Sequence, residues 1–293
     1  MRIRVLGAAA GGGFPQWNCG CGNCRKARAG SPDLVPLTQE CVALSADNER
    51  WFLLNASPEI RSQIEAFSAL HPRGPRHSPI AGIVLTNGDL DHCLGLLSLR
   101  ESQPITVYAT DAVRRGFTEG NVLYRTLERF PGQVTWKRIE ADLGDGLSVK
   151  AIPAPGKPPV HLEGRQKTQE DENVGLLVHD RKTGKRLAYF SSAGSITPAM
   201  RSTIEGADCL FFDGTFWSSD ELIAAGLGSK RAEEMAHLPV KESLEALRTI
   251  STKRKIYIHI NNTNPLLDRS SAERRRAEAM GWEIAHDGME FSL

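Results

Sequence analysis

The order of predicted strands and helices constrains the fold of this chain more than any other feature. Short apolar runs rich in β-branched residues, such as 80–86 and 255–260, are typical of buried strands. These runs fall into two halves, each rich in strands and each followed by helices. The length of 293 residues allows one large domain or two small ones. Because there is no linker, repeat or break in composition, we predict a single domain, 1–293, with two packed sheets and helices outside them.

The predicted elements alternate along the whole chain. Strands are expected at 2–6, 41–46, 51–55, 80–86, 105–109, 135–139, 147–152, 174–179, 187–190, 209–213, 255–260, 282–285 and 290–292. Helices are expected from Ser57, as N-cap, to about Leu70, at 92–100, 198–204, 240–250 and 271–280, and within 111–130. Two stretches rich in glycine or proline, 7–36 and 154–171, are predicted to be loops.

Charge and hydropathy exclude several classes of protein. The 36 basic and 35 acidic residues give a net charge of +1, which offers no global attraction for nucleic acid or an anionic membrane. No apolar run approaches the ~20 residues that span a bilayer. Arg2 and Arg4 are followed by a glycine run instead of the apolar stretch of a signal peptide. We therefore expect a cytoplasmic protein without a nucleic-acid or membrane partner.

Three of the six cysteines, Cys19, Cys21 and Cys24, lie close together in the chain. A reducing compartment disfavours disulfides, so clustered thiols there indicate a metal site or redox chemistry. The glycines between them let one tight loop turn three sulfur atoms toward a Zn²⁺ ion, with bonds of about 2.3 Å. We therefore predict a structural zinc loop at about 15–30. The sequence does not identify the fourth ligand, and His77 and Asn262 stay open as candidates.

Two other interpretations of the cysteines remain open. The cluster could be a chance grouping of small residues in a loop, or a redox pair, although no thioredoxin-like strand and helix surround it. The remaining cysteines have apolar neighbours and are expected to be small buried residues; they are Cys41, Cys93 and Cys209.

Acidic and imidazole side chains follow several predicted strands at the point where each strand ends. Loops at strand ends are where rigid scaffolds place chemistry. Any one of these residues has an ordinary alternative: Asp91 could cap a helix, and His259 could be a hydrogen-bonded core histidine. The joint pattern favours a site instead. Its members are Asp89, Asp91 and His92 after the strand 80–86, Asp213 at the end of 209–213, His237 in the loop beyond it, and His259 near the end of 255–260.

These residues lie in segments that resemble a known family. Residues 86–95, TNGDLDHCLG, resemble a degraded H-x-H-x-D-H motif of the metallo-β-lactamase superfamily. Within that superfamily the chain resembles the pyrroloquinoline quinone (PQQ) biosynthesis protein B family. The matching segments span nearly the full length: 11–24, 51–64, 85–101, 211–222, 233–239, 256–267 and 287–290. Of these, DGTFW, AHLP and HINNTNP are specific to the family.

The resemblance implies the αββα sandwich of that superfamily, an α+β fold, and assigns places to individual residues. Asn87 and Asp89 stand where the first two superfamily histidines stand. Asp91 and His92 take the Asp-His places, and His259 takes the place of the last metal histidine. The cysteine loop is similar to the structural zinc loop of phosphodiesterase members.

Of the further places compared with hydrolases, one pair is shared and two places differ. Asp213 and His237 resemble the carboxylate–histidine pair that supports catalysis in tRNA-processing hydrolases of this fold. Ser192 stands where hydrolases carry a metal-bridging aspartate. The histidine expected near 154–159 is missing, and nearby His161 is not assigned to its place.

These departures favour one metal over two. A two-metal hydrolase needs ligands for both ions and usually a bridge. Asp91, His92 and His259 remain, and two histidines with one carboxylate are the ligand set of open non-haem Fe(II) sites. Zn²⁺ could substitute for the iron, and Asp89 could add an oxygen ligand or hold a water.

The resemblance implies an iron- and oxygen-dependent hydroxylase acting in PQQ biosynthesis. Its substrate would be the tyrosine of a precursor peptide or of its cross-linked Glu–Tyr product. Asp213 and His237 would orient water or move protons, because histidine titrates near neutral pH. A metallo-β-lactamase-type hydrolase, a non-catalytic PQQ carrier and a paralogue acting on another phenol stay open as alternatives. A homodimer is compatible with the sequence.

Overall fold

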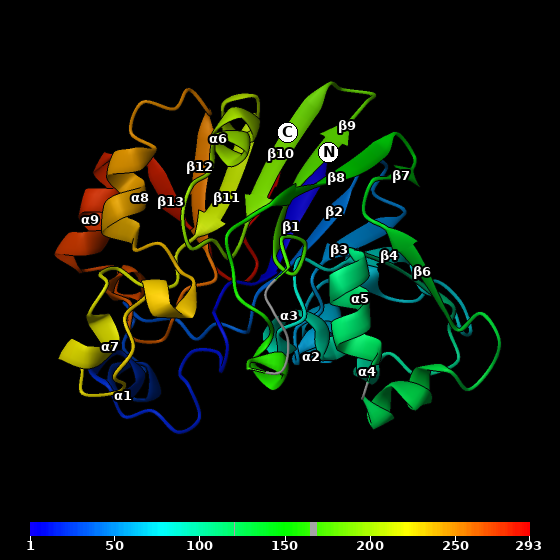
Figure 1. Ribbon diagram of the computed structural model, residues 1–293, viewed down its shortest axis with the longest axis horizontal. Coiled ribbons are helices and arrows are strands. Elements are labelled where there is room, and N and C mark those ends of the chain that lie inside the picture. The colour runs from blue at the N-terminus through cyan, green and yellow to red at the C-terminus, as the bar shows by residue number, and fades with distance from the viewer. Residues whose placement is uncertain (120, 165–168) are drawn as a thin grey trace.

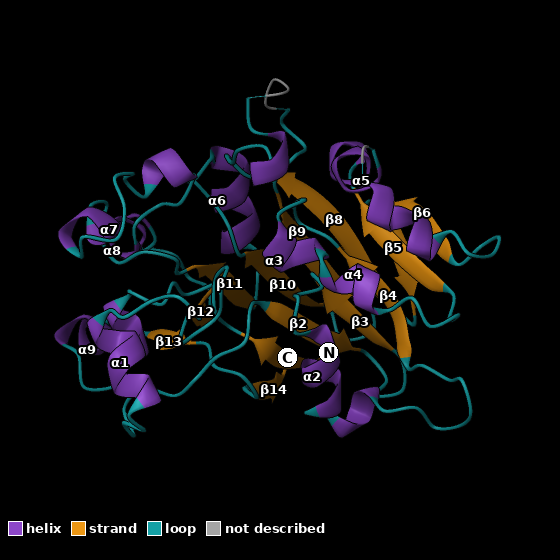
Figure 2. Cartoon of the chain, turned by 90° about the horizontal axis from the view of Figure 1, so that it is seen from below, coloured by secondary structure: helices purple, strands orange, loops and turns teal. Residues whose placement is uncertain are grey.

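The computed structural model describes residues 1–119, 121–164 and 169–293 and contains two mixed β-sheets packed face to face (Figures 1 and 2). This is the predicted α+β sandwich. Within the described ranges no helix has both the length and the hydropathy needed to cross a membrane.

Each sheet has the same plan of three antiparallel pairings followed by three parallel ones. The first sheet has the order β14 (Glu290–Ser292), β1 (Arg2–Gly7), β2 (Cys41–Ser45), β3 (Trp51–Leu54), β4 (Ile80–Val84), β5 (Ile105–Ala109), β6 (Val134–Arg138). The second has the order β13 (Trp282–Ile284), β12 (Arg254–Ile258), β11 (Cys209–Asp213), β10 (Lys185–Phe190), β9 (Val174–Asp180), β8 (Leu147–Pro153), β7 (Ala141–Gly144).

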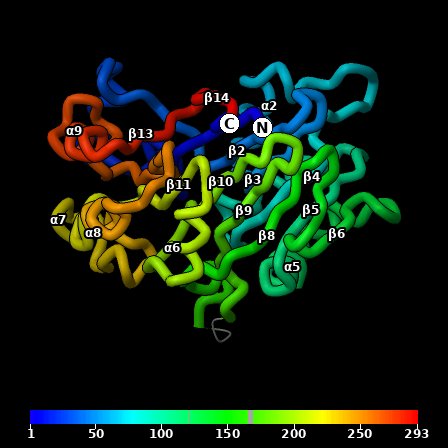
Figure 3. Tube along the Cα trace, turned by 90° about the horizontal axis from the view of Figure 1, so that it is seen from above, coloured from blue at the N-terminus to red at the C-terminus, as the bar shows by residue number. Residues whose placement is uncertain are grey.

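The helices lie mostly on the outer faces of the sandwich (Figures 2 and 3). They are α1 (Gly22–Arg28), α2 (Ile60–Glu65), α3 (Leu90–Cys93), α4 (Gly95–Ser98), α5 (Asp111–Thr118), α6 (Pro198–Glu205), α7 (Glu221–Ala224), α8 (Val240–Ala246) and α9 (Ala272–Ala279). Short 3₁₀ turns add η1 (Ser68–Leu70), η2 (Val122–Leu127), η3 (Val160–Leu162), η4 (Glu233–Met235) and η5 (Pro265–Leu267).

The side-chain alternation of β2 and β3 explains how one sheet serves two cores. Successive residues of a strand point to opposite faces, so a strand that is apolar throughout must be covered on both. Alternate side chains of β2 and β3 therefore form two sets: one set faces the second sheet, and the other faces α2, α4 and α5. The two sets are Val42, Leu44, Phe52 and Leu54 between the sheets, and Cys41, Ala43, Trp51 and Leu53 beneath the helices.

The strands agree closely with the sequence prediction, but three predicted segments differ. The predicted helix from Ser57 to Leu70 is shorter, because Ala56 bonds through both its N–H and its C=O to the segment around His92 and Gly95. Ser57 consequently does not cap the helix, and its hydroxyl donates to the Gln63 amide oxygen instead.

The predicted helix at 92–100 is two single turns, α3 and α4. The backbone of Gly95 approaches Ser57 so closely that an added Cβ would lie 2.2 Å from its carbonyl oxygen. The predicted loop at 7–36 also contains a helix, α1, because the Cys21 sulfur accepts the Cys24 N–H and caps its start. The strand β7 was not predicted.

Candidate active site

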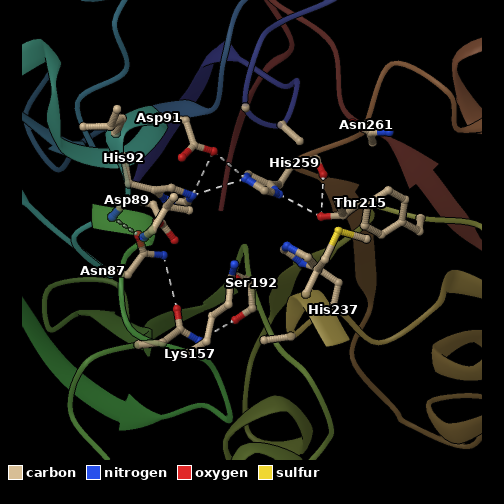
Figure 4. Close-up of a pocket in the computed structure, with 18 of the residues that line it drawn as sticks. Asn87, Asp89, Asp91, His92, Lys157, Ser192, Thr215, His237, His259 and Asn261 are labelled. Atoms are coloured by element: carbon tan, nitrogen blue, oxygen red, sulfur yellow. Dashed lines mark hydrogen bonds and ion pairs between the residues drawn. The ribbon is translucent and has the colours of Figure 1, made fainter. Parts of the chain in front are cut away.

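A cavity of about 450 Å³ opens where the strand ends of the two sheets meet (Figure 4). Carboxyl ends of parallel strands form one edge of a sheet, so residues far apart in sequence are gathered there. The lining includes five of the six residues predicted for the active site. The sixth, Asp213, is buried and bonds to His237 in the lining. The lining members are Asp89, Asp91, His92, His237 and His259.

Asp91, His92 and His259 point toward one another at one wall of this cavity (Figure 4). The His259 Nε2 atom lies 3.0 Å from Asp91 Oδ2 and 3.2 Å from His92 Nε2. The distance between His92 Nε2 and Asp91 Oδ2 is 3.5 Å. Metal–ligand bonds of about 2.1 Å would place neighbouring ligand atoms about 3.0–3.4 Å apart. The three donor atoms therefore fit a single metal ion.

The position of His259 results from an unusual backbone. The strand β12 ends at Ile258, so His259 is the first residue after the strand. Its φ is 60°. This left-handed conformation is uncommon for histidine and is typical of functional sites when the surroundings enforce it. It turns the ring out of the strand toward Asp91.

The pKa values of these groups diverge because they are buried together. Burial lowers the pKa of His92 to about 4. Burial also acts to lower that of His259, but the bond to Asp91 and the charge of that carboxylate raise it to about 9. Burial would raise the pKa of Asp91, yet the two histidines hold it well below its usual range. Near neutral pH the His259 ring is therefore protonated on both nitrogens, and a metal ion bound at Nε2 would displace one of these protons.

Asp213 and His237 form the carboxylate–histidine pair that the sequence analysis anticipated. The His237 Nδ1 atom lies 2.7 Å from Asp213 Oδ2, and the histidine ring stacks on that of His259 with 5.5 Å between centroids. Burial would raise the pKa of Asp213, but the charge and hydrogen bond of His237 lower it. Because Nδ1 donates to the carboxylate, Nε2 is the nitrogen available to a ligand in the cavity.

Thr215 links this pair to the metal cluster and was missed in the sequence analysis. Its Oγ atom lies 2.6 Å from Asp213 Oδ1 and 2.8 Å from His259 Nδ1. An ionised carboxylate only accepts, so the hydroxyl donates to Asp213 and its oxygen accepts from His259. This leaves Nε2 of His259 free for a metal. The available signals were its place two residues after Asp213 and its position within the family-specific segment DGTFW.

Asn87 and Asp89 line the cavity without joining the three ligands. Within the described residues, the groups whose donor atoms lie within 4.8 Å of one another include Asp91, His92 and His259 but not Asp89. The Asp89 carboxylate instead accepts the Val160 N–H at 3.1 Å, and burial raises its pKa. A role of Asp89 as a ligand or water holder stays a prediction.

The other superfamily positions do not add donors to the cluster. Ser192 lines the cavity, where its carbonyl accepts the Asn173 amide. His161 also lines the cavity, but its Nε2 lies 3.1 Å from the Gly116 carbonyl oxygen. Among the described histidines, cysteines and acidic residues, His161 belongs to no group of three whose donor atoms lie within 4.8 Å of one another.

The three clustered cysteines form a second candidate metal site. The Cys19, Cys21 and Cys24 sulfur atoms all lie within 4.8 Å of one another. The buried Asn262 side chain closes the group, with its amide nitrogen 3.1, 3.7 and 3.4 Å from the three sulfur atoms in that order. His77 lies elsewhere and accepts the Arg73 N–H. Three thiolates fit Zn²⁺. The Asn262 amide nitrogen donates hydrogen bonds to the sulfur atoms and is not a metal ligand in this orientation.

The other cysteines are buried, as predicted. Cys41, Cys93 and Cys209 are 0–1% exposed. Burial raises the pKa of each thiol, so none has the lowered pKa of a reactive cysteine.

Comparison with known proteins gives consistent results along the chain. Residues 50–260 match the family described as the beta-lactamase superfamily domain. Coenzyme PQQ synthesis protein B of Rhizobium meliloti (strain 1021) is 45% identical, over 100% of this chain and 98% of that protein. The protein of the same name from Methylococcus capsulatus (strain ATCC 33009 / NCIMB 11132 / Bath) is 44% identical over the full length of both.

Solved structures agree with these matches. Zn²⁺-bound PqqB from Methylobacterium extorquens superposes with a TM-score of 0.93 and 42% identity, and both chains are covered completely. A diphosphatase of the PhnP family gives a TM-score of 0.69 at 23% identity, covering 100% of this chain and 97% of that one. The second likeness shows the fold alone.

Proposed function

Because the chain belongs to the coenzyme PQQ synthesis protein B family of the metallo-β-lactamase superfamily, we propose that it acts in PQQ biosynthesis as an iron- and oxygen-dependent hydroxylase. Its substrate is the tyrosine ring of a precursor peptide or of the cross-linked Glu–Tyr product. The family supports the pathway, and the residues of the cavity support the reaction.

One observation carries the reaction type: the cavity gathers two histidines and one carboxylate for one metal ion. Asp91, His92 and His259 lie within 3.0–3.5 Å of each other. At places where two-metal hydrolases carry a histidine and a bridging aspartate, this chain has the amide of Asn87 and the hydroxyl of Ser192. An ion held by three protein groups keeps open positions, as in non-haem Fe(II) oxygenases. When bound, Fe(II) supplies the chemistry that activates dioxygen.

The residues around the cluster bind the phenol and handle its proton. Phe216 and Met235 give the cavity apolar contacts for an aromatic ring. The Nε2 atom of His237 is the acceptor or donor for the phenol hydroxyl, because Asp213 holds Nδ1. Lys157, ion-paired with Glu163, lines the same cavity and offers a cation for a carboxylate of the substrate.

The decisive experiment is anaerobic loading with Fe(II), then exposure to oxygen with the tyrosine-containing precursor or the Glu–Tyr product. The reaction inserts one atom of O₂ into the ring and releases the other as water, so an external reductant such as ascorbate supplies the two electrons. With it present, we expect oxygen uptake and a product heavier by one oxygen atom in mass spectrometry. An iron-saturated protein that yields no such product from either substrate would contradict the hydroxylase. Tight PQQ binding without oxygen uptake would indicate a carrier.

The Asp213–His237 pair favours one second candidate, a metal-dependent hydrolase. Such a pair can protonate a leaving group as well as a phenolate. That function requires two bound active-site metal ions and cleavage of a chromogenic phosphodiester. A single active-site ion with no cleavage would exclude it.

A further inference from the structure

The orientation of the buried Asn55 amide is fixed by its neighbours. The Asn55 Oδ1 atom accepts the Thr86 backbone N–H at 2.9 Å and the Thr86 hydroxyl at 3.0 Å. A backbone N–H can only donate, so the atom facing it must be the amide oxygen. The Asn55 amide nitrogen therefore faces the other way, where it lies 2.8 Å from Glu40 Oε2 and 2.7 Å from His92 Nδ1.

This arrangement determines which nitrogen of His92 carries the proton. The two amide hydrogens of Asn55 point at Glu40 and at His92 Nδ1, so Nδ1 accepts and a neutral ring carries its proton on Nε2. However, Nε2 is the atom that faces Asp91 and His259. Metal binding through Nε2 needs the other tautomer, in which an Nδ1–H must find an acceptor.

Glu40 has the free acceptor capacity for that Nδ1–H. Its side chain is completely buried and lies directly before β2. The Oε2 atom is 3.5 Å from His92 Nδ1, and Oε1 has no hydrogen-bond partner within the described chain. A buried carboxylate oxygen without a partner is costly and needs an explanation. Neither the fold nor the proposed reaction uses it.

We propose that Glu40 is a positioning residue of the metal site: its carboxylate accepts the Nδ1–H of His92, which leaves Nε2 as the metal-binding nitrogen. Asn55 keeps its bond to Glu40 and loses only its bond to His92 when Nδ1 takes up the proton. The inference rests on metal binding by His92, as in the proposed function, but not on the reaction. It extends the carboxylate–threonine–histidine chain at His259 to the second histidine, by an independent set of residues.

Thr86 is the competing acceptor. Its Oγ atom lies 3.3 Å from His92 Nδ1, slightly nearer than Glu40 Oε2. In the metal-free protein burial raises the pKa of Glu40 to about 8, so its carboxyl is largely neutral near pH 7. A bound metal cation favours the ionised carboxylate, and a bond from Nδ1–H to that charged acceptor is about twice as strong as one to the neutral Thr86 hydroxyl. The test must therefore separate the two residues.

The test is a Co²⁺ titration of the full-length protein, with the cysteine site kept loaded with zinc. Glu40→Gln is expected to weaken Co²⁺ binding about 10- to 100-fold, while zinc at the cysteines stays unchanged. Glu221→Gln is the control, because Glu221 is partly buried and accepts from the Trp217 N–H and the Thr263 hydroxyl instead of contacting a proposed metal ligand. Wild-type affinity in Glu40→Gln, with a large loss in Thr86→Val, would assign the acceptor to Thr86 and overturn the proposal.

A second measurement does not depend on any variant folding. In the zinc-loaded wild type, ¹⁵N-edited NMR should show a proton on His92 Nδ1, with the strongly downfield shift of a bond to a carboxylate. A zinc-loaded ring with no proton on Nδ1 would overturn the proposal. Because both readouts report metal binding, the outcome is separate from whether the loaded enzyme hydroxylates a phenol.

Discussion

At the residue scale, one buried carboxylate orients two histidines. Asp213 is fully buried and accepts the His237 Nδ1–H, the Ala193 N–H and both the N–H and the hydroxyl of Thr215. Through Thr215 it also fixes the ring of His259. The histidine proposed to handle protons, His237, and the one proposed to bind the metal, His259, thus share one hydrogen-bonded carboxylate. The two proposed functions therefore cannot be altered independently at Asp213.

Substitutions at Thr215 separate the proposed roles of His237 and His259 more cleanly than substitutions at Asp213. In Thr215→Val the oxygen that accepts from His259 is lost while the side-chain shape is kept. We expect active-site metal affinity to fall about 10- to 100-fold, because partners of metal-binding histidines have effects of that size. Thr215→Ser keeps the hydroxyl and should restore most of the affinity in the same Co²⁺ titration. Equal affinities for the valine and serine variants would contradict this role.

The raised pKa of His259 predicts how metal binding depends on pH. Because that pKa is about 9, the ring is protonated near neutral pH and the proton competes with the metal. Affinity should rise about tenfold per pH unit from neutrality and level off near pH 9. The pKa of His92, about 4, adds nothing in this range. Co²⁺ titrations across these pH values test the slope, and a flat profile would contradict the predicted competition.

At the element scale, the junction of α3 and α4 sets where His92 stands. Ala56 donates its N–H to the His92 carbonyl at 2.7 Å, and its own carbonyl accepts the Gly95 N–H at 2.9 Å. The end of β3 thus holds the first turn after β4. These two backbone hydrogen bonds of Ala56 explain why a continuous helix over 92–100 does not form.

Gly95 is the residue that permits this close contact. A Cβ at Gly95 would lie 2.2 Å from the Ser57 carbonyl oxygen, which is backbone and cannot rotate away. We expect Gly95→Ala to lower the free energy of unfolding by about 1–3 kcal/mol, the usual cost of overpacking, and to weaken metal binding by displacing His92. Urea unfolding measures the first effect. Gly74→Ala is the matched control, because no atom lies within 4 Å of its added Cβ; an equal loss there would contradict the argument.

At the scale of the whole molecule, the sequence predicted the central strands well because several of them, such as β2, β3 and β11, are apolar and buried on both faces. Ends such as Asp213 and His259 were recognisable for the same reason, since a polar residue interrupts an apolar run there. Glu40, Asn55 and Thr215 were missed because each is meaningful only through a contact across the fold. Asn55 follows β3, and its partners Thr86 and His92 come from the next strand end. No local pattern carries that information.

The cysteine site and the active site are joined by one short segment at the edge of the sandwich. His259 and Asn262 are separated by two residues, and the Asn262 side chain lies against all three sulfur atoms. Asn23 of the cysteine loop also donates to the Asn262 and Asn264 carbonyls. The loop therefore supports the backbone that holds His259 in its left-handed conformation.

This connection predicts that the structural zinc supports the catalytic metal at a distance. Cys24→Ser should abolish zinc binding at the loop, because a serine hydroxyl is a poor ligand for Zn²⁺. Elemental analysis should show the loss, and limited proteolysis should cut within about 15–30. Active-site Co²⁺ affinity should fall severalfold, since His259 loses its neighbouring support. Cys209→Ala should keep zinc content and Co²⁺ affinity, because this buried cysteine lies at the start of β11, at the opposite end of the strand from Asp213. Unchanged Co²⁺ affinity in the zinc-free Cys24→Ser protein would show that the two sites are independent.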